Sequence, residues 1–134
     1  MPTLLLDTDV VSFQLKGDSR ATAYAPLLQG NRLALSFMTV AELFQWVAVR
    51  KWGPRRIAQL DQVLASYLIV PVDVEMCRIW GTLRAEQQSA GRSIAPQDAW
   101  IAATALRHSL ALVTHNASDF QNIVGLDVRT AAHP

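Results

Sequence analysis

The sequence is poor in cysteine and in charged residues, and it has no long apolar run; each shortage excludes a class of protein. Cys77 is the only cysteine among the 134 residues, which excludes an intramolecular disulfide and a multi-cysteine zinc site. Asp7 interrupts the first apolar run before a signal peptide would form, and Arg107 and His108 break the longest one. We therefore expect a cytoplasmic protein of a reducing compartment, with no membrane segment.

The charges nearly balance, since 12 Lys and Arg face 11 Asp and Glu and the net charge is +1. This excludes a polybasic protein, so any contact with nucleic acid must be local. Charged residues make up 17% of the chain and hydrophobic residues 51%, whereas an average domain is about 25% charged. The composition excludes disorder and indicates a sheet buried on both faces, a partner-covered surface, or both. The length predicts one domain, residues 1–134.

Short apolar runs alternate with helical segments along the chain. We expect strands at residues 3–6, 32–36, 68–72 and 110–114, with a candidate fifth at 128–130. Helices are expected at residues 8–15, 20–28, 39–52, 54–67, 74–90 and 96–109. This order predicts an α/β fold of three layers, with helices on both faces of a central parallel sheet of four to five strands. In such sheets, ligands bind beyond the carboxyl ends of the strands.

Four acidic residues fall near that edge: Asp7, Glu42, Asp98 and Asp119. Each has a simple structural explanation, because Asp7 and Asp119 suit helix caps while Glu42 and Asp98 suit the first turn of a helix. Their convergence is harder to explain, since two carboxylates about 5 Å apart repel by roughly 3 kcal/mol. A divalent cation removes this repulsion, and an all-oxygen ligand set suits Mg²⁺ or Mn²⁺.

Four segments that carry these acids resemble the motifs of one family, the PIN-domain nucleases, in order and spacing. They are residues 4–10 (LLLDTDV), 36–43 (SFMTVAEL), 96–103 (PQDAWIAA) and 112–120 (LVTHNASDF). The resemblance covers nearly the whole chain, and the length is similar to that of VapC-type toxins of type II toxin–antitoxin systems. Asp9 stands where many members of the family have Asn, which adds a negative charge near the expected site.

The resemblance implies a PIN-domain fold and a Mg²⁺-dependent endoribonuclease in which Mn²⁺ is able to substitute. Asp7 and Asp98 would bind the metal directly, while Glu42 and Asp119 would bind it directly or through water. A metal-activated water would then cleave the RNA, for which tRNA is the favoured substrate. Supporting positions are occupied by Thr8, Asp9, Thr39, Thr114 and Asn116. A VapB-like antitoxin and a second copy of the chain are the partners that the family implies.

Three features outside the acids have two interpretations each. Arg50, Lys51, Arg55 and Arg56 gather where one helix ends and the next begins, as possible RNA contacts or as a solvated corner. Trp46 shares a helix face with Glu42, where it would line a groove for an antitoxin, a second copy or an RNA base, or else belong to the core. Cys77 and Trp80 share a face of helix 74–90 that we expect to be buried.

Other functions compete with the nuclease. A haloacid-dehalogenase-type phosphatase also begins with a strand and Asp-x-Asp, but it and a response-regulator receiver need a late catalytic lysine, and the lysines here are Lys16 and Lys51. The remaining alternative is a non-catalytic PIN-like module that binds RNA or protein. The four intact acids argue against that module, because a site that only binds has no need of mutually repelling carboxylates.

Overall fold

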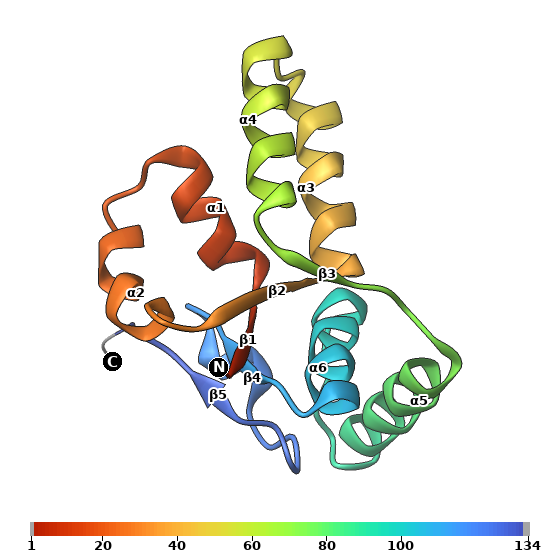
Figure 1. Ribbon diagram of the computed structural model, residues 1–134. Helices are drawn as coiled ribbons and strands as arrows, with labels where there is room; N and C mark the ends of the chain where they lie inside the picture. Colours follow the sequence, from red (N-terminus) through yellow and green to blue (C-terminus); the bar gives the residue numbers. More distant parts are fainter. Residues whose placement is uncertain (1, 133–134) are drawn as a thin grey trace.

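Five parallel strands form the central sheet of the computed structural model, which describes residues 2–132 (Figure 1). They are β1 (Thr3–Leu6), β2 (Arg32–Ser36), β3 (Leu68–Val70), β4 (Ala111–Val113) and β5 (Val128–Arg129). Their spatial order is β3-β2-β1-β4-β5, so β1 lies in the middle with Leu5 opposite Ala34 on one side and Leu112 on the other. The parallel sheet is confirmed, and the candidate fifth strand is part of it.

The helices of the described residues lie where the sequence predicts them, with ends that agree to within two residues. They are α1 (Thr8–Lys16), α2 (Ala21–Leu28), α3 (Phe37–Arg50), α4 (Pro54–Ala65), α5 (Val74–Ser89) and α6 (Pro96–His108). A short 3₁₀-helix, η1 (Ala117–Phe120), was not predicted. The α3–α4 hairpin projects beyond the edge of the sheet (Figure 1).

The expected position of Glu42 in the first turn of its helix is wrong. The side chain of Ser36 caps α3 by accepting a 3.1 Å hydrogen bond from the backbone N–H of Met38, so the helix begins at Phe37. Glu42 therefore lies in the second turn, where the helix dipole offers a carboxylate little stabilisation. Its position needs another explanation.

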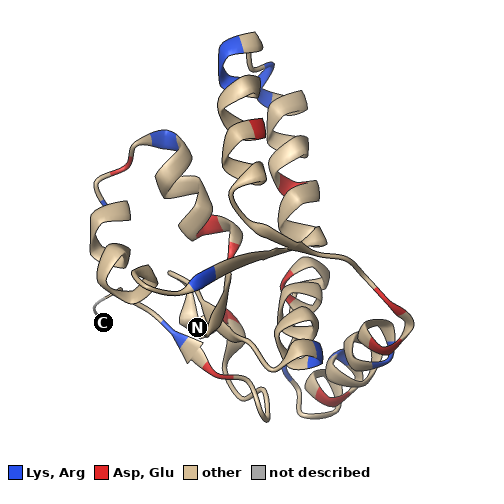
Figure 2. Cartoon of the chain, viewed as in Figure 1, with Lys and Arg blue, Asp and Glu red and all other residues tan. Residues whose placement is uncertain are grey.

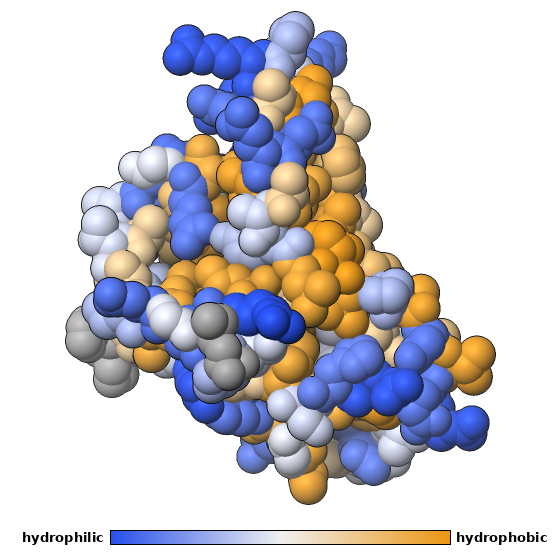
Figure 3. All heavy atoms as spheres, viewed as in Figure 1, coloured by the Kyte–Doolittle hydropathy of each residue, from blue (hydrophilic) through white to orange (hydrophobic). Residues whose placement is uncertain are grey.

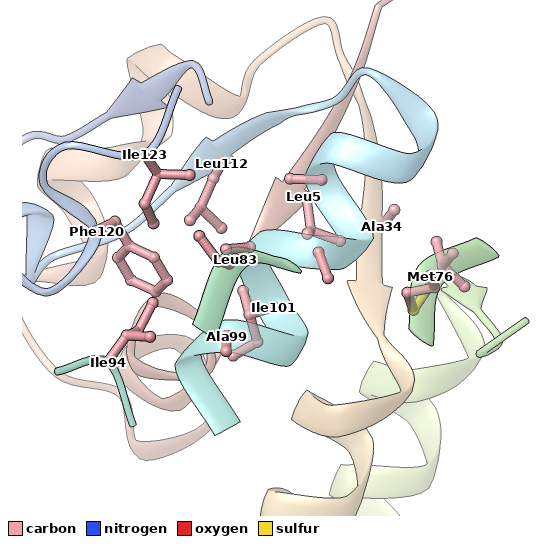
Figure 4. Close-up of a cluster of buried hydrophobic side chains, with 14 residues drawn as sticks. Leu5, Ala34, Met76, Leu83, Ile94, Ala99, Ile101, Leu112, Phe120 and Ile123 are labelled. Atoms are coloured by element: carbon pink, nitrogen blue, oxygen red, sulfur yellow. The ribbon is translucent and has the colours of Figure 1, made fainter. Parts of the chain in front are cut away.

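Alternate residues of the strands belong to two separate apolar cores, one on each face of the sheet, which confirms the three-layer architecture. Leu5, Ala34 and Leu112 face α5 and α6 and pack with Met76 and Ile101 (Figure 4). The neighbouring strand residues face the opposite way and pack against α1 to α4; they include Leu4, Leu6, Leu35, Ala111 and Val113. Strands buried on both faces must be apolar throughout, which is why they read as continuous apolar runs.

The expectation that Cys77 is buried is wrong, because its side chain is exposed. The buried residues of α5 are Met76, Leu83 and Gln87, and Cys77 is rotated by about 100° from Met76 around the helix axis. Trp80 is half-buried and packs against the core. Among residues 2–132, no helix combines the length and apolar character that crossing a membrane requires.

Candidate active site

The four acids expected at the carboxyl edge of the sheet come from four different elements. Asp7 directly follows β1, where its backbone N–H donates a 2.8 Å hydrogen bond to the carbonyl of Val113 on β4. Glu42 lies in the second turn of α3, Asp98 in the first turn of α6, and Asp119 within η1. In Figure 2, acidic segments at the starts of α1 and α6 and on α3 surround this edge.

The electrostatic effects of these carboxylates on one another indicate that they lie near one another. Burial, and after it the negative charges of Asp119, Glu42 and Asp9 in that order, raise the pKa of Asp98 to about 6. Burial is also the main cause that raises the pKa of Asp7 to about 7, with Asp9 next and Asp98 as a smaller contribution. Because such effects weaken with distance, Asp7, Glu42 and Asp119 lie near Asp98.

Two threonine hydroxyls hold Glu42 in place. The hydroxyl of Thr8 donates a 2.9 Å hydrogen bond to Oε1 of Glu42 and lies 2.9 Å from the hydroxyl of Thr39. A hydroxyl has one proton to donate, so Thr8 accepts the bond from the buried Thr39. Burial raises the pKa of Glu42, and the hydrogen bond from Thr8 opposes that shift. Glu42 is therefore fixed by α1 rather than by the dipole of its own helix.

Thr114 performs the same task for Asp7. Its hydroxyl donates a 2.7 Å hydrogen bond to Oδ2 of Asp7, while the backbone N–H of Thr8 donates at 2.8 Å to Oδ1. Both bonds favour the ionised carboxylate and lower the pKa that burial raises. The Thr114 oxygen also accepts a 3.1 Å bond from the backbone N–H of Asn116, which fixes the turn after β4.

Asp9 joins α1 to that turn. Its carboxylate accepts hydrogen bonds from the backbone N–H groups of Val10 at 2.7 Å and His115 at 3.1 Å, and from Nδ2 of Asn116 at 2.9 Å. Burial is the main cause that raises its pKa, and these bonds lower it. Since the N–H of Asp119 in turn donates to the carbonyl of Asn116 at 3.0 Å, the turn that Asp9 holds also carries Asp119.

One residue of this hydrogen-bond network, Tyr24, was not predicted from the sequence. Oη of the fully buried Tyr24 on α2 lies 2.6 Å from Nδ1 of His115, whose ring packs edge-on against Phe13 at 5.1 Å. Tyr24 is a single tyrosine in an apolar helix, so no local pattern indicates its partner. The contact fixes the His115 ring beside the acids.

The described residues offer the acid cluster little compensating positive charge. They contain four ion pairs, and none of them involves residue 7, 9, 42, 98 or 119. Arg20 lies close enough for the charge of Asp9 to act on it, although the hydrogen bond with Asp18 is the main cause that raises the pKa of Arg20. As the side chains of residues 2–132 are placed, no three carboxylate, His or Cys groups form an arrangement that could hold a metal ion.

The basic residues that we expect to contact RNA lie away from the acids, at the tip of the α3–α4 hairpin (Figure 2). Two of them lie against indole rings, Arg50 at 5.0 Å from the centroid of Trp46 and Arg56 at 4.7 Å from that of Trp52. Trp46 itself is half-buried at the margin of the core under α3 and also contacts Lys16 at 5.3 Å. RNA contact by Arg50, Lys51, Arg55 and Arg56 stays a prediction.

The similarity to known proteins extends over nearly the whole chain. The family model described as "PIN domain" matches residues 4–126. "VapC ribonuclease Y4jK" from Sinorhizobium fredii is 30% identical over 93% of this chain and 94% of its own length. "Toxin FitB" from Neisseria gonorrhoeae is 33% identical, with 87% of this chain and 90% of its own covered. The "tRNA(fMet)-specific endonuclease VapC" of Shigella flexneri is 25% identical, with 94% and 96% covered.

The fold is similar to that of a solved toxin–antitoxin complex. VapBC2 from Rickettsia felis, bound to a DNA fragment from its promoter, contains a chain that matches with a TM-score of 0.85 and 26% identity, covering 96% of this chain and 98% of that one. The chain belongs to the PIN-domain family, and within that family it groups with the VapC-type proteins.

Proposed function

We propose that this protein is a metal-dependent endoribonuclease, the toxin of a VapBC-type toxin–antitoxin pair, and that residues 1–134 form one PIN domain. The observation that carries the proposal is the cluster of Asp7, Glu42, Asp98 and Asp119 around one edge of the sheet, where burial and mutual repulsion raise the pKa of Asp98 to about 6. Keeping such a cluster destabilises the fold, so a function must favour it.

The donor set fits a hard divalent cation. All the clustered ligands are carboxylate oxygens, and the hydroxyls of Thr8 and Thr114 orient two of them. Mg²⁺ and Mn²⁺ prefer such oxygen ligands, whereas zinc sites are dominated by Cys and His. Asp7 and Asp98 would hold the ion directly, with Glu42 and Asp119 as direct or water-mediated ligands. When bound, the cation supplies neutralisation of phosphate charge and acidification of a water molecule.

The chain's own groups then perform two tasks. Thr114 and the Thr8 N–H fix the orientation of Asp7, so this carboxylate has little conformational freedom to lose when it binds the ion. Glu42, fixed by Thr8, has a raised pKa that suits it to accept a proton from the attacking water. The water oxygen forms a bond to phosphorus as the bond from phosphorus to a sugar oxygen breaks, which is hydrolysis of a phosphodiester.

The relatives support the choice of substrate and partner. The names of the Shigella and Sinorhizobium proteins describe RNA-cleaving enzymes, so we propose RNA, and tRNA within it, as the substrate. The complex from Rickettsia supports a VapB-like antitoxin as the partner. A hydrophobic area beside α3 and β3 in Figure 3, with the exposed side chains of Phe44, Leu68 and Ile69, supports burial against this antitoxin or a second copy of the chain.

The test is cleavage of total tRNA by the purified chain with Mg²⁺ or Mn²⁺. The Asp7→Asn and Asp98→Asn variants should each cut at least about 100-fold more slowly than the wild type, because each loses a direct ligand. Asp61→Asn is the matched control, since Asp61 is an exposed carboxylate on α4. Wild-type binding of RNA without cutting would instead support the non-catalytic module, and equal rates for all variants would exclude the acids from the reaction.

A further inference from the structure

A hollow of about 540 Å³ lies between α5 and the loop that follows this helix. Gly81 and Arg84 on the helix and Arg92 and Ser93 in the following loop line it, and its lining contains no acidic residue. Two guanidinium groups around a hollow favour an anion, and the planar guanidinium suits the two oxygens of a phosphate in particular. The surrounding surface over α5 is mostly hydrophilic (Figure 3).

Stacked aromatic rings connect this hollow to the acid cluster. The indoles of Trp80 and Trp100 stack with centroids 4.9 Å apart and planes at 18°, and the guanidinium of Arg84 lies 5.2 Å from the ring of Trp80. Nε1 of Trp80 donates a 3.2 Å hydrogen bond to the carbonyl of Pro96. Pro96 and Trp100 stand two residues before and after Asp98, so the half-buried indoles lie next to the turn that carries this acid.

Neither the backbone conformation of Gly81 nor the space around it requires a glycine. It lies in the interior of α5 with an ordinary helical backbone, and a Cβ at this position would meet no atom within 4 Å. Glycine destabilises a helix interior relative to alanine because it restricts the unfolded chain least. Its effect here is to leave the floor of the hollow without a side chain, one turn from Arg84, where a backbone of another molecule can approach closely.

We propose that this hollow binds the sugar-phosphate backbone of the RNA substrate next to the cleaved bond, with phosphate oxygens on Arg84 and Arg92 and a base against the exposed part of the indole stack. The inference rests on the proposed ribonuclease function and deepens it. Single-stranded RNA is held by this combination of cationic and aromatic groups, since every base has a face that stacks and every nucleotide a charge. The acids repel phosphate, so a nearby cationic site offsets that repulsion.

The first experiment measures binding of a fluorescein-labelled single-stranded RNA of random sequence, by anisotropy, in EDTA so that no cutting occurs. The double variant Arg84→Gln/Arg92→Gln should bind about tenfold more weakly. The negative slope of log K against log salt should become shallower by about 1.4, or ~0.7 for each lost phosphate contact. Arg78→Gln is the matched control, because Arg78 is an exposed arginine of the same helix that pairs with Glu75 at 3.2 Å. It should change neither quantity.

The second experiment fills the hollow without changing its charge. A Cβ at residue 81 would meet no atom within 4 Å, and glutamine favours a helix more than glycine does, so Gly81→Gln should fold. It should weaken RNA binding and raise KM for tRNA cleavage with little change in kcat. Cys77, exposed one turn before Gly81 on the same helix, offers a unique site for a photo-crosslinker that should capture the RNA in the wild type but not in the double variant.

The outcomes separate the two hypotheses. If the wild type binds and cuts RNA while the double variant shows the same affinity and salt slope, the hollow is not an RNA site and the proposed function stands. If the double variant instead changes the mass of the protein in sedimentation, the hollow belongs to an interface between copies, which also overturns the inference. If the wild type neither binds nor cuts any RNA, the proposed function fails and the inference fails with it.

Discussion

The hydroxyl of Thr114 donates a 2.7 Å hydrogen bond to Oδ2 of Asp7, joining the turn after β4 to the end of β1 across 107 positions of sequence. Because this bond favours the ionised carboxylate, Thr114→Val should raise the pKa of Asp7 above the value of about 7 that it has in the wild type. A hydrogen bond to a charged group contributes about 1.5–3 kcal/mol, so the cleavage rate at neutral pH should fall roughly tenfold.

The pH profile distinguishes this effect from simple damage to the fold. In Thr114→Val the acidic limb of kcat/KM should move to higher pH, and part of the rate should return in alkaline buffer. Thr114→Ser keeps the hydroxyl and should follow the wild-type profile. An unshifted acidic limb in the valine variant would show that this bond does not control the ionisation of Asp7.

Replacing Asp7 should stabilise the metal-free protein. Its pKa is raised from 3.8 to about 7, chiefly by burial, so between these two values the folded state binds more protons than the unfolded state. The free energy of unfolding of the wild type therefore falls as the pH rises through this range, and the loss is complete above about 7. Asp7→Asn should be more stable above that pH by about 2–4 kcal/mol, and little different below pH 4.

Urea unfolding at a series of pH values, with and without Mg²⁺, measures this difference. Asparagine can accept from the Thr8 N–H and donate to the Thr114 oxygen, so both contacts of residue 7 survive the change. Added Mg²⁺ should stabilise the wild type more than the variant, since it binds the folded site. A variant less stable than the wild type in alkaline, metal-free buffer would contradict the conclusion that the buried, ionised carboxylate of Asp7 destabilises the fold.

The glycine of α5 predicts a second stabilising substitution. Gly81→Ala adds a methyl group that meets no atom within 4 Å, so it should raise the free energy of unfolding by about 0.5–1 kcal/mol through helix propensity. Urea unfolding of the two proteins checks this. A loss of stability would reveal a backbone requirement at residue 81 and would remove one of the reasons for assigning a ligand to the hollow.

The tip of the α3–α4 hairpin offers a test of its expected RNA contacts that avoids the stacked arginines. Lys51→Gln/Arg55→Gln removes two exposed charges and leaves Arg50 on Trp46 and Arg56 on Trp52. If RNA reaches the tip, the affinity for total tRNA should fall, and the negative slope of log K against log salt should become shallower by about 1.4–1.8. An unchanged slope, with unchanged thermal stability, would assign the tip to a solvated corner.

The sequence predicts the acids of the site because their position depends on chain direction alone. Parallel strands end at the same edge, so Asp7, after β1, and Asp119, after β4, must come near each other once the strands are located. Asp98 follows from the helix that leads into β4. These inferences require only the hydrophobic periodicity that identifies each strand or helix and the residues at which it begins and ends.

The contacts that orient the acids were not predictable in the same way. The hydrogen bond from Thr8 to Glu42 depends on the angle between α1 and α3, and the contact of Tyr24 with His115 spans 91 positions. The exposure of Cys77 and the stacking of Trp80 on Trp100 depend on which face α5 turns to α6. Such relationships are set by packing between helices, and the helical period leaves the choice of face open where apolar residues occur on more than one side.

Binding of Mn²⁺ to the full-length protein, without RNA or antitoxin, tests the central claim most directly. Calorimetric titration at a pH above the value of about 7 that burial gives Asp7 should show saturable binding to the wild type. Asp98→Asn should bind at least about 10–100-fold more weakly, and Asp61→Asn should match the wild type. Absence of saturable binding to the wild type, or equal affinity in Asp98→Asn, would contradict the assignment of these carboxylates to a metal.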